Sequence, residues 1–326
     1  MSKFISGFAA DLEAMLAYRE ALGFSRFSSE PVLLNFDRYA AVHYPDMTNL
    51  SREVATSWID IHLDKSNNNI SGKATALRHF GKYLSAIGKE AYILPDEYAS
   101  PPKSEFVPYL FSDDELARLF RSVDSLPETS SNRLATKIPS VLFRLIYTCG
   151  LRPNEGRELL RENINFKTGE IFITKTKRKK ERIVVMSGDM LGLCKKYVAA
   201  SDSLGVSGTY FFPDKDGKPH TATQLERWLK KSWDAANPKV PADELPNIRV
   251  YDLRHRFAST VLNRWLDEKQ NLYNKLPYLR AYMGHDTLAE TAHYIHIMPE
   301  NIIKSAGVDW AAFEAILPSI GEGVAL

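Results

Sequence analysis

The chain has 326 residues, of which 44% are hydrophobic and 25% are charged, and its formal net charge is only +2. This length favours two domains over one small core, and the composition is that of an ordinary globular protein. No segment approaches the roughly 18 apolar residues of a membrane span, and the N-terminus lacks the apolar run of a signal peptide, so we expect a cytoplasmic protein with no membrane association.

The first 95 residues read as a domain of short helices around 5–22, 31–43, 50–64 and 70–86. The last of these helices carries Arg78 and Lys82 one turn apart. Two interpretations stay open for this basic pair: a solvated edge of a helical bundle, or a helix laid against DNA phosphates.

Residues 95–108 contain four prolines and few large apolar residues, so we predict a linker at 96–108. A helix begins directly afterwards, because Ser112 with Glu115 three residues later forms the pattern of a capping box. A further helix is expected to stop at Gly150, and Pro153 suits the first position of the next one.

The segment from 170 to 186 has two β-rich runs, 170–176 and 182–186, around a basic turn, which predicts a hairpin. Its centre, KTKRKKER at 175–182, has six basic residues in eight, which indicates a solvated face or a nucleic-acid contact. Helices return after residue 220. The predicted fold is therefore mainly α with a small β-hairpin, a helical N-terminal domain followed by a mixed α+β domain.

Cys149 and Cys194 are the only cysteines and have no paired spacing, which argues against a zinc ribbon or a disulfide scaffold and fits a reducing cytosol. His285, His293 and His296 could in principle gather around a metal, but no second ligand cluster accompanies them. We therefore expect no metal site.

Several polar residues stand where a purely structural role is awkward. Helical periodicity places Arg254 in the middle of the apolar face of VYDLRHRFASTVLNRWL, where an arginine needs an anionic partner. The remaining members of this set are Arg152 with Glu155 one turn later, Lys177 near the tip of the hairpin, His285 after a glycine, and Tyr294. Each alone has an ordinary structural interpretation, such as an ion pair or a half-buried tyrosine.

In this order and spacing, the set resembles the tyrosine recombinase family of phage-integrase type. The segments that carry the resemblance are TCGLRPNEG, TKRKKER, YDLRHRFAS and MGHDTLAETAHYIH. The resemblance covers residues 109–302 as a catalytic domain, and the N-terminal helices look like the family's core DNA-binding domain at 1–95.

The resemblance implies a DNA strand transferase that cuts and rejoins DNA through a 3′-phosphotyrosyl intermediate, without metal or cofactor. Its implied catalytic residues are Arg152, Lys177, Arg254, His285 and the nucleophile Tyr294, with Glu155 in support. Further DNA contacts are expected from Arg78, Lys82, Lys175, Arg178, Lys179 and Lys180.

Tyr251 departs from the family pattern, which most often has histidine three residues before the second arginine. A tyrosine hydroxyl can donate to a phosphate oxygen, but its pKa of roughly 10 makes it a poor proton shuttle near neutral pH. A DNA-binding relative with weakened chemistry is therefore one alternative, and a type IB topoisomerase is another.

The resemblance also implies double-stranded DNA as partner, a homotetramer on paired sites, association with the nucleoid, service to a mobile element, and accessory DNA-bending or directionality factors. Residues 303–326 form a tail in which Trp310, Phe313 and Ile316 could anchor a helix. Exchange of this helix between protomers and packing on its own domain are equally open.

Overall fold

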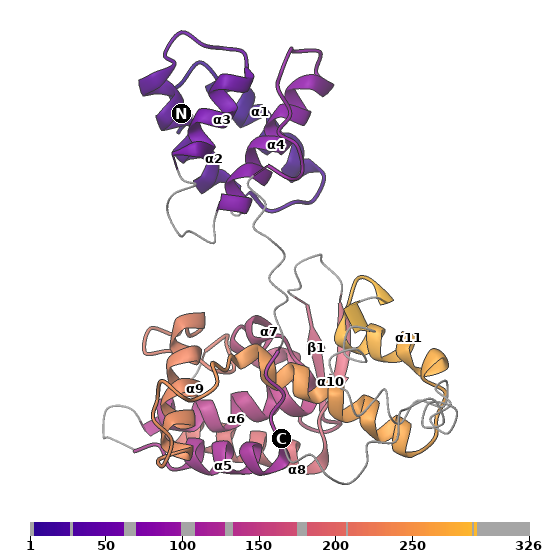
Figure 1. Cartoon of the computed structure of the whole chain (residues 1–326). Coiled ribbons are helices and arrows are strands. Elements are labelled where there is room, and N and C mark those ends of the chain that lie inside the picture. The colour runs from indigo at the N-terminus through magenta and orange to yellow at the C-terminus, as the bar shows by residue number, and fades with distance from the viewer. Residues whose placement is uncertain are drawn as a thin grey trace, which may run out of the picture. The chain divides into compact units, whose positions relative to one another are not determined.

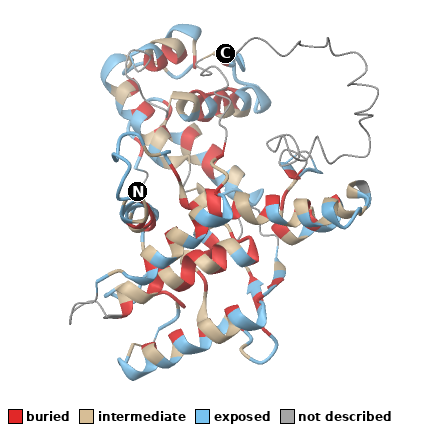
Figure 2. Ribbon diagram, turned by 60° about the horizontal axis from the view of Figure 1, so that its bottom comes forward, coloured by how far each residue is buried: buried red, intermediate tan, exposed pale blue. Residues whose placement is uncertain are grey.

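A computed structural model describes residues 3–26, 29–61, 70–98, 108–127, 133–174, 181–206, 208–288 and 290–291. The chain divides into two compact units, Met1–Phe106 and Val107–Leu326, called here the N-terminal and C-terminal units (Figure 1). Each unit has its own core of buried apolar side chains. Figure 2 shows the buried residues in red along the ribbon. The finer division into a linker at 96–108 and a tail at 303–326 stays a prediction, since most of the first and all of the second lie outside the described residues.

The described part of the N-terminal unit is helical. It contains α1 (Ala9–Ala21), α2 (Glu30–His43), α3 (Arg52–Asp60) and α4 (Ile70–Ala86). Phe8, Phe36, Phe80 and Trp58 meet in its core, with ring centroids 5.3–6.3 Å apart. These helices lie where the apolar periodicity predicts them.

The C-terminal unit is mainly helical, with one small sheet. Its elements are α5 (Asp113–Asp124), α6 (Arg133–Cys149), α7 (Pro153–Arg157), the 3-10 turn η2 (Arg161–Asn163), β1 (Glu170–Ile173), β2 (Arg182–Val185), α8 (Gly188–Ser203), α9 (Ala222–Ala236), α10 (Val250–Asp267) and α11 (Leu272–Met283). Strands β1 and β2 pair antiparallel, with Glu170 opposite Val185 and Ile173 opposite Arg182. The mainly α fold class with a small hairpin is confirmed.

Local chemistry explains where two of these helices begin and end. Ser112 and Glu115 form the predicted capping box at α5, each side chain accepting a hydrogen bond from the other residue's backbone N–H. Helix α6 ends at Cys149, and the next residue, Gly150, has a φ of +62°, the left-handed conformation that suits glycine. Pro153 opens α7 directly after Arg152, whose backbone is extended, as the sequence predicts.

No helix in the described ranges is both long and apolar enough to cross a membrane.

Candidate active site

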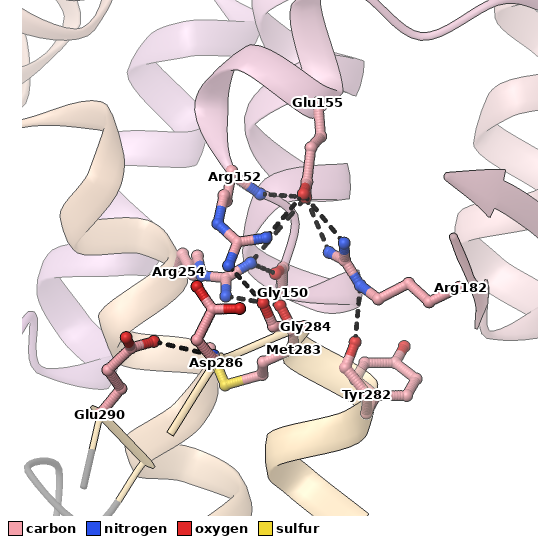
Figure 3. A network of polar contacts seen from close by, with 10 residues as sticks. All are labelled: Gly150, Arg152, Glu155, Arg182, Arg254, Tyr282, Met283, Gly284, Asp286 and Glu290. Atoms are coloured by element: carbon pink, nitrogen blue, oxygen red, sulfur yellow. Dashed lines mark hydrogen bonds and ion pairs between the residues drawn. The ribbon is translucent and has the colours of Figure 1, made fainter. Parts of the chain in front are cut away.

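Glu155 is the carboxylate around which the site is built. It stands in the first turn of α7, where its Oε2 accepts from the backbone N–H of Arg152 at 2.8 Å. The Arg152 Nη1 donates to Oε1 at 2.8 Å. The junction between α6 and α7 therefore presents Arg152 with its guanidinium already held, as the sequence predicts for this pair (Figure 3).

A second arginine, Arg182, holds both oxygens of the same carboxylate. Its Nη1 and Nη2 lie 2.9 and 2.7 Å from Glu155 Oε1 and Oε2, and its Nε donates to the carbonyl of Tyr282 at 2.8 Å. Sequence reasoning counted Arg182 in the basic run but gave it no role. The available signal was its position, because it opens the predicted strand 182–186, whereas Lys177, Arg178, Lys179 and Lys180 fall in the predicted turn.

Arg254 is fully buried on α10, as the helical periodicity predicts. Its Nη1 donates to the Gly150 carbonyl at 2.6 Å and its Nη2 to the Met283 carbonyl at 2.7 Å. The nearest carboxylate, Glu155, lies 3.9 Å from Nη1. The anion that the apolar surroundings demand is therefore supplied within the protein, together with two carbonyl dipoles.

The loop after α11 closes the site from a third direction. Gly284 adopts a φ of +66°, and a Cβ there would lie 3.1 Å from Arg182 Nη1 and 3.4 Å from Arg152 Nη1. Its carbonyl accepts from Arg152 Nη2 at 2.5 Å. A glycine is needed here because the two guanidiniums pack against its backbone.

His285 follows this glycine and is buried beside the arginines. Its backbone N–H donates to the Arg280 carbonyl, and its Nδ1 lies 2.8 Å from the Thr291 hydroxyl. Burial and then the charges of Arg254, Arg152 and Arg182 lower the pKa of His285 from 6.5 to about 3. The imidazole is therefore neutral at physiological pH, with one ring nitrogen engaged by Thr291.

The charges of the cluster do not balance. Burial alone would raise the pKa of Glu155, but hydrogen bonds and charge from Arg182 and Arg152 outweigh it and lower that pKa from 4.5 to about 2. Burial likewise opposes the charge of Arg152, yet its contacts with Glu155 raise its pKa. Three arginines thus share one ionised carboxylate and a neutral histidine, which leaves a positive potential suited to an anion such as a phosphate.

Tyr251 lies in the first turn of α10, on the side of the cluster. Its ring centroid is 6.0 Å from the guanidinium carbon of Arg254 and 4.9 Å from the ring of His255. A hydrogen bond and charge from Tyr251 also contribute to the raised pKa of Arg152. The residue at the family's variable position is therefore in contact with the arginines.

Two predicted members of the site, Lys177 and Tyr294, lie outside the described residues, as do four predicted DNA contacts, Lys175, Arg178, Lys179 and Lys180. The structure brings together Arg152, Glu155, Arg254 and His285, and adds Arg182.

Arg78 is placed differently from what the sequence predicts. Its side chain is 11% exposed, and it donates to the carbonyls of Leu94, Pro95 and Asp96 at 2.8, 2.6 and 3.3 Å. In this arrangement Arg78 ties α4 to the segment that follows it, because the carbonyls of an irregular segment need donors. Lys82, one turn later, is exposed as expected.

Among the described residues there is no group of three or more His, Cys, Asp or Glu that could hold a metal ion. His293 and His296 lie outside this part of the chain.

An arginine-rich site with an excess of positive charge, on a helical unit with a small hairpin, has the chemistry expected of a site for phosphoryl transfer. Comparison with known proteins identifies the family. The sequence model of the phage integrase family matches residues 110–301. The chain therefore belongs to the phage integrase family, whose members are tyrosine recombinases and act as DNA strand transferases.

Relatives and solved structures agree with this assignment. The tyrosine recombinase XerD of Rhizobium meliloti is 26% identical over 298 residues, which cover 90% of this chain and 91% of XerD. The structure of the site-specific recombinase XerH bound to its difH substrate has a TM-score of 0.62 at 17% identity, covering 88% of this chain and 80% of XerH. The Tn1549 transposon integrase, solved with transposon end DNA, has a TM-score of 0.60 at 13% identity, covering 93% and 97%. Likeness at this level of identity establishes the fold.

Proposed function

We propose that this protein is a site-specific recombinase that cuts and rejoins double-stranded DNA through a 3′-phosphotyrosyl intermediate on Tyr294. The observation that carries the proposal is the meeting of Arg152 and Arg254 at Glu155, with His285 buried beside them, in a chain of the phage integrase family. A diester phosphate has the charge that this cluster lacks.

Arg152 is the first partner of the phosphate in this proposal. Its side chain is 28% exposed, whereas that of Arg254 is fully buried. Arg152 would bind a non-bridging oxygen directly, and Arg254 would add its fixed charge from beneath as equatorial charge grows in the transition state. Neither guanidinium loses its proton at working pH, so the positive charge needed by the reaction is available without a metal ion.

Proton transfer falls to the other members of the site. The Tyr294 oxygen attacks phosphorus and forms a P–O bond while the bond from phosphorus to the 5′ oxygen breaks. Lys177 gives a proton to that leaving oxygen, which would otherwise depart as an alkoxide. Neutral His285 donates a hydrogen bond to a phosphate oxygen, and Tyr251 takes the weaker supporting role of a hydroxyl donor.

The phosphotyrosyl ester preserves the energy of the broken diester, so resealing needs no nucleotide cofactor. Lys82 and the basic residues of the hairpin turn would contact the DNA backbone. We further propose a homotetramer on paired sites that serves a mobile element. The transposon integrase among the structural neighbours and the tetrameric lambda integrase complex on a Holliday junction support this proposal by analogy.

A covalent trap tests the chemistry. Nicked duplexes drawn from the DNA that flanks this gene would be incubated with the protein and with Tyr294→Phe as the matched control, then separated on a denaturing gel. An adduct with the wild-type protein alone is the expected result. DNA binding without an adduct, unchanged when Tyr251 is replaced by histidine, would instead indicate a binding protein that has lost the chemistry.

A further inference from the structure

Two arginines share the Glu155 carboxylate, but they do so unequally. Arg182 binds it with both ends of its guanidinium, because Nη1 and Nη2 donate to Oε1 and Oε2 at 2.9 and 2.7 Å. Arg152 donates to it with one side-chain nitrogen, Nη1, at 2.8 Å, and its Nη2 donates to the Gly284 carbonyl instead. The two-nitrogen geometry is the stronger one, so Arg182 is the main partner of this carboxylate.

The two arginines also differ in what they can reach. The side chain of Arg182 is 8% exposed, and its Nε donates to the Tyr282 carbonyl at 2.8 Å. All three nitrogens of this guanidinium are therefore engaged inside the protein (Figure 3). The side chain of Arg152 is 28% exposed. A phosphate that arrives from outside can thus meet Arg152, whereas Arg182 is confined to the interior of the site.

The charge left over for a phosphate depends on the buried pair. Burial raises the pKa of Glu155, but the hydrogen bonds and charge of Arg182, followed by the hydrogen bonds of Arg152, lower that pKa to about 2. Glu155 therefore stays ionised near neutral pH and needs a cation beside it. In the part of the chain that the structure describes, it is the only carboxylate within ion-pair distance of Arg152 or Arg182. Without Arg182, the negative charge of Glu155 would fall mainly on Arg152.

We propose that Arg182 is the internal counter-ion of Glu155, and that by neutralising this carboxylate it leaves the charge of Arg152 available for the scissile phosphate. This inference rests on the proposed function. Arg182 acts through Glu155 and Arg152 and touches neither DNA nor the reacting atoms, so it is a positioning residue. Together with Arg254, three cations surround one carboxylate, and two positive charges remain for an anion. Only one would remain without Arg182.

The first test compares a charged phosphate with an uncharged one. One duplex carries the normal diester at the cleavage position, and in a second a methyl group replaces one non-bridging oxygen, which removes the negative charge. Arg182→Met removes the counter-ion and fills its place with an apolar side chain. We expect cleavage of the diester to slow roughly 10- to 100-fold, and cleavage of the methyl substrate to stay within about threefold of wild type, because only the diester needs the charge of Arg152.

The second test restores the balance of charge. Arg182→Met combined with Glu155→Gln removes one positive and one negative charge, and it keeps an amide oxygen that can accept from Arg152. We expect the double variant to regain diester cleavage to within about fivefold of the wild-type rate. A purely structural role predicts the opposite, because the second substitution would remove further buried hydrogen bonds and lower the rate again.

Arg144→Met is the matched control. Arg144, on α6, forms the same two-nitrogen pair with a carboxylate, that of Asp124, at 2.8 and 2.7 Å, and none of its described bonds reaches Glu155. This variant should leave the rates on both substrates unchanged. The ratio of the two rates measured on one preparation does not depend on the folded fraction, so the comparison stays valid even if Arg182→Met loses stability.

Equal slowing of the diester and the methyl substrate by Arg182→Met would overturn the inference, since the effect would then be independent of the charge on the phosphate. No slowing of either substrate would overturn it as well, and so would a double variant that is no faster than Arg182→Met alone. Failure of the wild-type protein to cleave the diester would instead contradict the proposed function itself.

Discussion

At the scale of single residues, Glu155 decides the character of the site. One carboxylate accepts two bonds from the Arg182 guanidinium and one each from the side chain and backbone of Arg152, and it lies 3.9 Å from Arg254. Removing it would leave three buried or half-buried cations in mutual repulsion, which is among the larger costs a point mutation can bring. The positive potential that suits a phosphate is thus stabilised by a single negative group.

His285 gives a prediction about pH. Its pKa is lowered from 6.5 to about 3, first by burial, so between these values the unfolded chain binds a proton that the folded chain does not. Stability is therefore present above pH 6.5 and is lost as the pH falls below it, by roughly 2 kcal/mol at about pH 5.

The measurement is the free energy of unfolding in urea at about pH 7.5 and about pH 5, for wild type and His285→Asn. The asparagine variant, which has no titrating ring, should lose less stability between the two values. A wild-type loss no larger than that of the variant would show that His285 is not held neutral.

At the scale of elements, the C-terminal ends of two helices supply the carbonyls that hold Arg254. The carbonyl of Gly150, directly after α6, accepts a hydrogen bond from Arg254 Nη1. The carbonyl of Met283, the last residue of α11, accepts one from Arg254 Nη2. Each of these helices is followed directly by a glycine with a positive φ, Gly150 after α6 and Gly284 after α11. The buried arginine therefore uses the carbonyls that helix ends leave unpaired.

Gly150→Ala tests this arrangement. A Cβ at Gly150 would lie 2.5 Å from Cδ1 of Phe257, in addition to the cost of its left-handed backbone. We expect the free energy of unfolding to fall by about 2 to 5 kcal/mol. Gly205→Ala is the matched control, because Gly205 follows α8 with φ +67° and has nothing within 4 Å of the virtual Cβ. It should lose only about 1 to 2 kcal/mol, and equal losses in urea titrations would contradict the role of Phe257.

Helix α4 offers a second contrast, between Arg78 and Lys82. Arg78 is engaged by backbone carbonyls, whereas Lys82 is exposed. Lys82→Ala should leave stability unchanged and reduce the salt dependence of DNA binding by about one unit in the log–log slope. Arg78→Ala should instead lower the free energy of unfolding by about 1 to 3 kcal/mol, because it leaves buried carbonyls without donors.

Two measurements distinguish these variants. Fluorescence titrations with DNA at several salt concentrations give the salt dependence of binding, and urea unfolding gives the stability. An unchanged salt dependence for Lys82→Ala would show that Lys82 does not contact the DNA.

At the scale of the whole molecule, the chain is two units with separate cores, Met1–Phe106 and Val107–Leu326, and the described site belongs entirely to the second. This organisation suits a protein that engages DNA with more than one body. The cleavage chemistry proposed here therefore depends on residues of one unit.

Deletion of residues 303–326 tests how the tail is used. If the tail passes to a neighbouring protomer, the shortened protein should still form the covalent adduct but should fail to assemble on paired sites. Native gel shifts with one and with two sites measure assembly, and the full-length chain is the control. Assembly that survives the deletion would show that the tail packs on its own unit.

The sequence by itself determined the features that depend on near neighbours along the chain. The capping box at Ser112, the end of α6 at Gly150, the hairpin and the burial of Arg254 all follow from periodicity or from residues within one helical turn. The family pattern then singled out Arg152, Glu155 and His285, which the fold brings together.

Only the tertiary structure decided which charges meet. Arg182 reaches Glu155 across 27 positions, and Arg254 reaches Gly150 across 104. Arg78 turns inward to carbonyls 16 to 18 positions away, although its spacing with Lys82 indicates an exposed edge. A sequence shows that an arginine carries charge, but its partner depends on packing between distant segments. In a low-dielectric interior, that partner determines whether the charge supports the fold or faces a ligand.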